Sequence, residues 1–194
     1  MRPTRGTLIV AACGLAVALL GACSQQTGGD PSPTTSSSPS SGSATSSTPK
    51  VDQPKNLKAV DACQLLNSSQ LHELGATATP TAGQSVWGEK SCEWGNDDIN
   101  IGLSPDTTHG KGLSTVYANM SGTENFLPMK IAGYPAARTA KQTISCGIYV
   151  ATSDTQDFLV DLTVLGAKRA DHEDPCSLAQ KVAADVLSNL PAGH

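Results

Sequence analysis

The sequence predicts an α+β fold: an antiparallel β-sheet with N- and C-terminal helices packed on one face, and two disulfides. Three observations predict it. Apolar residues recur at helical spacing near both ends of the folded part. Between those ends their period changes to two, which is typical of strands with one buried face. Four widely spaced cysteines lie in the same part, as in exported domains stabilised by disulfides.

The amino end of the chain predicts export. Residues 7–20 form an apolar run that follows two arginines and is shorter than the roughly 20 residues of a membrane-spanning helix. The run ends in Leu20-Gly21-Ala22-Cys23, which resembles the lipobox of bacterial lipoproteins. The resemblance implies that a diacylglycerol is attached to the Cys23 sulfur and that a signal peptidase cleaves between Ala22 and Cys23. A secretory signal cut at another site and an uncleaved anchor are the alternatives.

The segment after Cys23 is rich in Ser, Thr, Pro and Gly and predicts a disordered tether, because it has too little apolar surface to bury. O-glycosylation of this segment is an alternative to a bare linker. The predicted domains are a lipoprotein signal peptide over 1–22, the lipidated cysteine and tether over 23–55, and a single α+β globular domain over 56–194. A double-chain lipid would hold that domain at the cell membrane, on its extracytoplasmic face.

The charge of the mature chain excludes one class of partner. Of 13 basic residues, Arg2 and Arg5 fall in the predicted signal peptide, so 11 remain against 17 acidic residues, and no basic run is present. This balance predicts no nucleic-acid binding and no electrostatic docking on anionic lipid. The membrane is therefore a partner only through the lipid anchor.

The first predicted helix begins at Asp61, with Gln64 completing a capping box, and ends at Gly75. Three hairpins with alternating apolar residues follow. Their predicted strands are 91–94 with 99–103, 128–131 with 136–140 through Gly133-Tyr134-Pro135, and 143–151 with 157–165. A short helix over 113–120 is expected between the first two hairpins. The last helix begins at Asp174-Pro175 and is stopped by Pro191.

Four cysteines remain in the predicted domain: Cys63, Cys92, Cys146 and Cys176. We favour the pairs Cys63–Cys92 and Cys146–Cys176, because each closes a loop of about 30 residues. Three pairings are possible, and the sequence does not decide among them. A zinc site is the rival interpretation, but the chain has no C-x-x-C motif.

These elements together resemble a known family. The motifs that carry the resemblance are Leu20-Gly21-Ala22-Cys23, Asp61-Ala62-Cys63-Gln64-Leu65-Leu66, Leu74-Gly75, Ser91-Cys92-Glu93-Trp94, Ile131-Ala132-Gly133-Tyr134-Pro135-Ala136, Cys146-Gly147-Ile148-Tyr149-Val150 and Asp174-Pro175-Cys176-Ser177-Leu178-Ala179. In this order they are similar to the actinobacterial lipoproteins of domain-of-unknown-function family 3558. The resemblance implies a surface lipoprotein with paired cysteines, and it brings no established catalytic residues. The layout is also similar to extracytoplasmic sensor domains of some receptor kinases, which is an analogy of fold alone.

No nucleophile motif, metal-ligand motif or phosphate-binding loop occurs in the chain, so we expect no enzyme, no catalytic residues, no cofactor and no metal site. His72, His109 and His194 are expected on the surface. His172-Glu173-Asp174 is better explained by helix capping than by cation binding. Asn96-Asp97-Asp98 with Asn100 is likewise better explained by a tight turn than by calcium binding.

Trp87 and Tyr134 are the candidate ligand-binding residues, whereas Trp94 is expected in the core next to Cys92. The favoured function is a binding or sensory module at the cell envelope that holds a small molecule, a glycan or an envelope protein. A non-catalytic structural partner in an envelope complex and a cell-wall hydrolase are the alternatives. A concave pocket beside Trp87 or Tyr134 would favour binding, and a featureless sheet would favour the structural partner.

Overall fold

The structure, a computed structural model, describes residues 47–166 and 174–193. Cys23 and Ala22, the predicted lipidation and cleavage positions, lie outside the described residues, together with the predicted signal peptide and most of the tether. Of the residues considered for catalysis or cation binding, His172, Glu173 and His194 also lie outside them.

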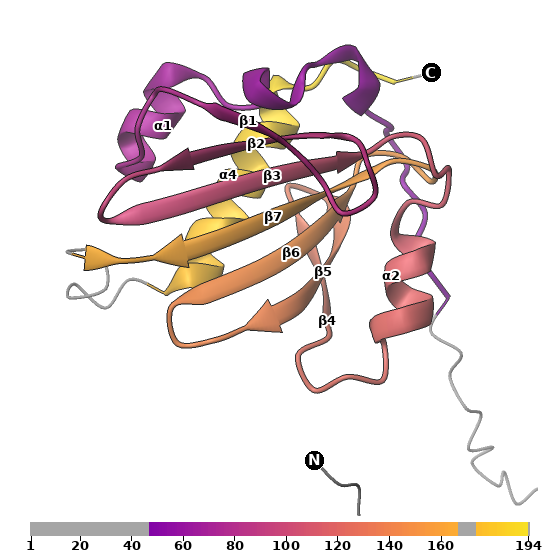
Figure 1. The fold of residues 1–194 in the computed structure, drawn as a ribbon. Coiled ribbons are helices and arrows are strands. Elements are labelled where there is room, and N and C mark those ends of the chain that lie inside the picture. Colours follow the sequence, from indigo (N-terminus) through magenta and orange to yellow (C-terminus); the bar gives the residue numbers. More distant parts are fainter. Residues whose placement is uncertain (1–46, 167–173, 194) are drawn as a thin grey trace, which may run out of the picture. The chain divides into compact units, whose positions relative to one another are not determined.

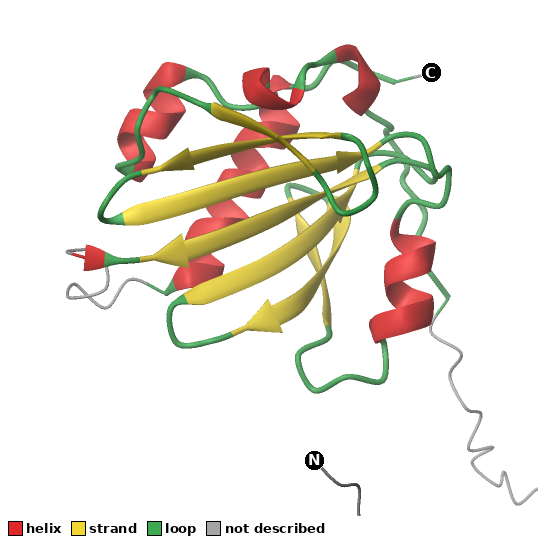
Figure 2. Ribbon diagram, viewed as in Figure 1, coloured by secondary structure: helices red, strands yellow, loops and turns green. Residues whose placement is uncertain are grey.

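In the described residues, seven strands form one antiparallel sheet in the order β1-β2-β3-β7-β6-β5-β4 (Figures 1 and 2). The strands are β1 (Thr81–Gln84), β2 (Lys90–Gly95), β3 (Ile99–Asp106), β4 (Leu127–Ile131), β5 (Tyr134–Lys141), β6 (Ser145–Ala151) and β7 (Asp157–Val164). After β3 the chain crosses to the other edge of the sheet and returns through β4, β5 and β6. As a result β7 pairs with both β6 and β3 in the middle of the sheet.

The inner face of the sheet carries the main core and is covered by the first and last helices. The helical elements are η1 (Leu57–Ala59), η2 (Ala62–Gln64), α1 (Ser68–Leu74), α2 (Leu113–Met120) and α4 (Pro175–Asn189). Apolar residues of α1 and α4 join those of β2, β3, β6 and β7 in one buried cluster, which contains Trp94 and Cys92 as expected. The predicted α+β class, with terminal helices on one face, is confirmed.

Helix α2 packs on the opposite, outer face of the sheet. Its residues Leu113, Val116 and Tyr117 form a second, smaller cluster with Ala137 of β5 and Ala151 of β6. Alternation along each strand explains the separation, because Ala137 and Ala151 point away from the neighbours that enter the main core. The helix itself is predicted by its spacing, but the face that it covers is not. Its position leaves part of the outer face uncovered (Figure 1).

The beginning of the first helix differs from the sequence prediction. Asp61 caps only the single turn η2, with its side chain accepting from the Cys63 backbone N–H. The capping box belongs to Asn67 and Gln70, whose side chains exchange hydrogen bonds with each other's backbone N–H groups at the start of α1. Asp61 and Asn67 are both residue types that cap helices well. In the folded domain the longer helix, α1, begins after Asn67. Gly75 ends α1 in a left-handed conformation, as predicted.

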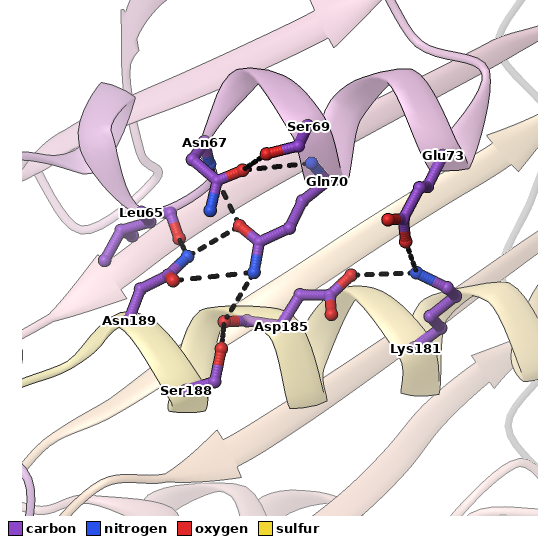
Figure 3. Close-up of polar contacts among 9 residues, drawn as sticks. All are labelled: Leu65, Asn67, Ser69, Gln70, Glu73, Lys181, Asp185, Ser188 and Asn189. Atoms are coloured by element: carbon purple, nitrogen blue, oxygen red, sulfur yellow. Dashed lines mark hydrogen bonds and ion pairs between the residues drawn. The ribbon is translucent and has the colours of Figure 1, made fainter.

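Polar side chains join α1 to α4 (Figure 3). The Asn189 amide donates to the Leu65 carbonyl oxygen at 2.9 Å and to Gln70 Oε1 at 2.7 Å. Lys181 lies between Glu73 of α1 and Asp185 of its own helix, at 3.4 and 3.2 Å. The capping glutamine of one helix is therefore also a partner of the other helix.

Both disulfides form with the favoured pairing. Cys63–Cys92 joins η2 to β2 across a sequence separation of 29, and Cys146–Cys176 joins β6 to the first turn of α4 across a separation of 30. Each bond attaches a helical segment to the inner face of the sheet. All four cysteines are thus used in disulfides, and the rival zinc interpretation is wrong.

Two strand predictions need correction. Strand β1, at the edge of the sheet, is missing from the sequence prediction because Thr81–Gln84 is exposed at every position and has no apolar alternation. Tyr134 is the first residue of β5, opposite Ile131, and does not lie in the turn. The turn consists of Ala132 and Gly133, both with positive φ, as the two central residues of a tight hairpin turn require.

Contacts with the domain begin before position 56, the predicted start of the globular domain. The Lys55 N–H donates to the Thr152 carbonyl oxygen at 2.7 Å, and Lys55 bridges Ala192. Further towards the amino end, Lys50 pairs with Asp154 at 2.9 Å. Among the described residues, no helix is long and apolar enough to cross a membrane.

Candidate functional site

A pocket of about 230 Å³ lies between α2 and the uncovered part of the outer sheet face. It is lined by Trp87, Asp106, Gly112, Thr115, Val116, Asn119, Met120, Thr139, Tyr149 and Asp157. Apolar and aromatic groups form most of its wall, and two aspartates provide its ionisable groups apart from Tyr149. Mostly apolar concave sites with a few convergent polar groups are the usual form of small-ligand sites in proteins.

Trp87 is held against the sheet by the turn between β1 and β2. Its indole Nε1–H donates to the Pro105 carbonyl oxygen at 2.6 Å. Its ring centroid lies 6.4 Å from that of Tyr149 on β6, with the ring planes inclined by 40°. The turn itself crosses in front of β3 and β7 in Figure 1. The ring that the sequence marks as a ligand candidate therefore forms a wall of the pocket.

Glu89 fastens the same turn to the end of β3. Its carboxylate accepts hydrogen bonds from the backbone N–H and hydroxyl groups of both Thr107 and Thr108, at 2.6 to 2.9 Å. Burial alone would raise the pKa of Glu89, but these hydrogen bonds outweigh it and leave the pKa below its usual value. Glu89 is thus an ionised anchor that keeps Trp87 in place.

Asp157, the first residue of β7, lies at the inner end of the pocket. Its side chain is buried, with only 3 % of the residue exposed. Within the described part of the chain, no hydrogen bond or ion pair reaches its carboxylate. Since no fully buried side-chain oxygen of these residues lacks a partner, the carboxylate oxygens keep some exposure, and Asp157 lines the pocket. Burial, and then the negative charges of Asp106 and Glu89, raise the pKa of Asp157 to about 7, partly offset by His109.

Asp106 and Asp157 lie directly opposite each other in the β3–β7 ladder. Like charges in such positions repel, and this arrangement is unfavourable unless a cation or proton is shared. Asp106 interacts with His109, whose Nδ1 lies 3.0 Å from Asp106 Oδ1. Asp157 has no comparable partner in the described residues, so the pocket has a negative potential that His109 offsets only in part.

Tyr149 responds to the same field. Burial raises the pKa of its phenol, and the charges of Asp157, Asp106 and Asp161 raise it further. Tyr149 therefore stays neutral and presents its ring together with a hydroxyl group. A neutral aromatic pair beside the buried Asp157 and the partly exposed Asp106 is suited to hold a positively charged group.

Glu89, Asp106 and His109 also form a cluster whose ligand atoms all lie within 4.8 Å of one another. Asp106 contacts the His109 ring and backbone N–H, and Glu89 binds Thr107 and Thr108, so both carboxylates hold the loop after β3. This explains the cluster as a structural fastening. His109 is half-exposed in that loop, in keeping with the surface position expected for it.

The other ligand candidate, Tyr134, lies elsewhere. Its hydroxyl donates to the Gln53 carbonyl oxygen at 2.8 Å. It lines a separate cavity of about 240 Å³ that is formed with the segment at 51–53 and the β4–β5 turn. The structure therefore does not bring Trp87 and Tyr134 together. A larger cavity of about 400 Å³ involves Asp154, whose carboxylate already binds Lys50 and the Val51 N–H.

The residues considered as cation ligands have structural roles where they are described. The Asn96 side chain accepts from the N–H groups of Asp98 and Ile99, which closes the β2–β3 turn. Asp174 caps α4 by accepting from the N–H and the hydroxyl of Ser177, both at 2.9 Å. The interpretations as turn and helix cap account for both positions.

Sequence reasoning missed Asp106, Tyr149 and Asp157 as parts of a site. The alternation of the strands does carry a signal: Asp157 and Asp161 alternate with the core residues of β7, and Tyr149 alternates with those of β6, so all three belong to the outer face. What the sequence lacks is the strand order, which places β3, β6 and β7 side by side.

Comparison with known proteins gives one family. The model of a family described as "Protein of unknown function (DUF3558)" matches residues 18–189. No curated protein and no solved structure matches the chain.

Proposed function

The chain belongs to the DUF3558 family, and we propose that it is a lipid-anchored extracytoplasmic protein whose folded domain is a binding or sensory module at the cell envelope. The observation that carries the binding role is the pocket beside Trp87, which is lined by the largely buried Asp157, a residue whose carboxylate has no partner among the described residues. A protein that acted only as a scaffold would have no need for such a group, which destabilises the domain as it stands.

The anchoring part of the proposal rests on Leu20-Gly21-Ala22-Cys23 at the end of the apolar run. Cells that express the full chain should incorporate a clickable fatty acid into it, and Cys23→Ser should abolish that labelling. Ser24→Ala, which keeps the cysteine, should be labelled like the unchanged protein. Labelling that persists in Cys23→Ser would contradict the anchor.

The binding part is tested by thermal unfolding of the mature chain in the presence of fractionated envelope components. A ligand that binds only the folded state raises the melting temperature in proportion to the logarithm of its concentration. Trp87→Ala, which opens the wall of the pocket, should lose the response. A complete screen without any shift would contradict a binding role.

The structural-partner alternative is supported by one observation, the exposed edge strand β1. All of its positions are exposed, and its outer backbone groups can accept another strand. Under this alternative an envelope protein co-purifies with the chain, and Trp87→Ala does not change the yield. A cell-wall hydrolase would instead turn over muropeptide or ester substrates.

A further inference from the structure

The pocket beside Trp87 has ionisable groups of one sign. Among the described residues that line it, Asp106 and Asp157 are acidic and none is lysine or arginine. Four residues of α2 face it, and all are uncharged: Thr115, Val116, Asn119 and Met120. Because the described residues that line the pocket include no lysine or arginine and His109 offsets the charge of Asp157 only in part, a bound cation would add the missing balance.

Asp157 is the second independent feature that points to a ligand. It is 97 % buried by accessible surface, since 3 % is exposed, yet it borders the pocket and has no partner within the described chain. A carboxylate that is largely removed from water and has no partner is disfavoured in its charged form, so it is either protonated or paired with a bound cation. A positively charged ligand group would remove that penalty on binding.

The aromatic wall restricts the kind of cation. The donor group of Trp87 is used by Pro105, so that its ring offers only its π surface, and the Tyr149 ring lies at 6.4 Å. Such faces attract organic ammonium groups, especially where water is excluded. A metal ion would instead need several ligand atoms close together. Among the described residues, the cluster with that spacing joins Asp106 to Glu89 and His109 and does not include Asp157.

The volume of the pocket restricts the size of the ligand. At about 230 Å³ the pocket is smaller than the roughly 300–1,000 Å³ typical of sites for drug-sized ligands. It therefore fits one headgroup of a larger molecule or a small free amine.

We propose that this pocket binds an organic ammonium group, with Asp157 as its counter-ion and with Trp87 and Tyr149 as its aromatic wall. The inference rests on the proposed binding function and names the ligand class of the same site. Asp106, opposite Asp157, adds to the negative potential, while Glu89 fixes the turn that carries Trp87.

The chain contains two tryptophans, which makes a direct measurement possible. Trp94 is 1 % exposed in the core, so a change in fluorescence on adding a ligand reports on Trp87. The full mature chain is titrated with choline, with n-butylammonium and with 3,3-dimethylbutan-1-ol, the neutral isostere of choline. We expect a saturable response to at least one ammonium compound and binding of the neutral alcohol at least about tenfold weaker.

Variants assign the effect to residues, with calorimetry as the readout because fluorescence depends on Trp87. Asp157→Asn should weaken ammonium binding by roughly thirtyfold or more, since it removes the counter-ion. Trp87→Leu should weaken it by about five- to thirtyfold. Asp161→Asn is the matched control, because it lies four residues later on the same face of β7 and does not line the pocket. Asp106→Asn serves if Asp157→Asn fails to fold.

Three outcomes would overturn the inference. Equal binding of choline and its neutral isostere would show that charge is not recognised. Tight binding of calcium or magnesium without any ammonium binding would assign the carboxylates to a metal. No response to any probe would reject the ligand class, and the proposed function would still stand if envelope components raise the melting temperature.

Discussion

Asp157 and Glu89 show how neighbouring donors decide the state of a carboxylate. Burial raises the pKa of both groups. Glu89 then receives hydrogen bonds from Thr108 and Thr107, which lower its pKa overall. Asp157 receives none in the described residues and is surrounded by other acids, so its pKa rises to about 7. The same residue class thus gives a fixed anchor in one position and a titrating group in the other.

The raised pKa of Asp157 predicts a loss of stability with increasing pH. Below the ordinary aspartate pKa of 3.8, both the folded and unfolded states are protonated, so folding is not penalised. Between that value and about 7 the unfolded state releases its proton first, and the free energy of unfolding falls. The fall attributable to this group is at most about 4 kcal/mol, because a tenfold change in proton affinity is worth about 1.4 kcal/mol.

Urea unfolding at intervals from pH 4 to pH 8 measures this effect. Asp157→Asn should remove the largest part of this fall. Asp161→Asn should remove a smaller part, because burial also raises the pKa of Asp161. The groups that face Asp157 are Asp106, Glu89, His109 and Tyr149, and they are unchanged in both variants. Equal slopes in the unchanged protein and in Asp157→Asn would show that Asp157 has an ordinary pKa.

Gly112 predicts a second effect at this scale. Its φ of +48° is unfavourable for other residues, and a Cβ placed there would lie 2.8 Å from the Asp154 carbonyl oxygen. Gly112→Ala should lower the free energy of unfolding by about 1–3 kcal/mol, because α2 must move away from the 153–154 turn. Gly122→Ala is the control, since nothing lies within 4 Å of its Cβ position and its φ is not positive. Denaturant unfolding measures the free energy of unfolding of both variants. An equal loss in Gly112→Ala and Gly122→Ala would contradict the steric strain at position 112.

At the scale of elements, helix α1 depends on contacts with the rest of the fold. Helix α1 has seven residues, which is too short to be stable alone in water. Leu71 and Leu74 on its apolar side are buried in the core. Its polar side is bound to α4 through the hydrogen bond between Gln70 and Asn189 (Figure 3). The pair of helices therefore forms as a unit on the inner face.

Asn189→Ala tests this coupling. It removes hydrogen bonds to Leu65 and Gln70 in a partly buried position, and we expect a loss of about 1–2 kcal/mol in the free energy of unfolding. Glu73→Gln removes an exposed partner of Lys181 on the same helix pair, and should change stability by less than about 0.5 kcal/mol. Chemical denaturation gives both values. If Glu73→Gln destabilises as strongly as Asn189→Ala, the buried amide contacts are not what couples the helices.

At the scale of the whole molecule, the two disulfides attach the helical segments to opposite halves of the sheet. Each closes a loop with a sequence separation of about 30, so each should contribute about 3–4 kcal/mol by the chain-entropy estimate. The paired variants Cys63→Ser with Cys92→Ser, and Cys146→Ser with Cys176→Ser, should each lower the melting temperature. The measurement is calorimetric unfolding together with a count of free thiols. A paired variant that melts with the unchanged protein would contradict the contribution of that bond.

Much of the fold follows from the sequence because its signals are local. Asp174 and Pro175 define the start of α4, Gly75 defines the end of α1, and alternation over β3 and β7 defines central strands. Loop length favoured the two disulfide pairs, but only the structure decides between the three possible pairings. Strand β1 does not follow from the sequence, because an exposed edge strand leaves no apolar pattern, and the capping box at Asn67 does not, because Asp61 offers an equally good cap signal.

The sequence by itself determined the fold class and marked Trp87 as a ligand candidate, whereas loop length favoured the cysteine pairs without deciding them. Only the tertiary structure decided that Trp87, Tyr149, Asp106 and Asp157 meet in one pocket and that Tyr134 does not. The physical reason is that a period of two tells which residues share a face of a strand, whereas the neighbours across the sheet depend on strand order. The strand order results from two features of the topology. The chain crosses from β3 to β4 at the other edge of the sheet, and β7 pairs with β3.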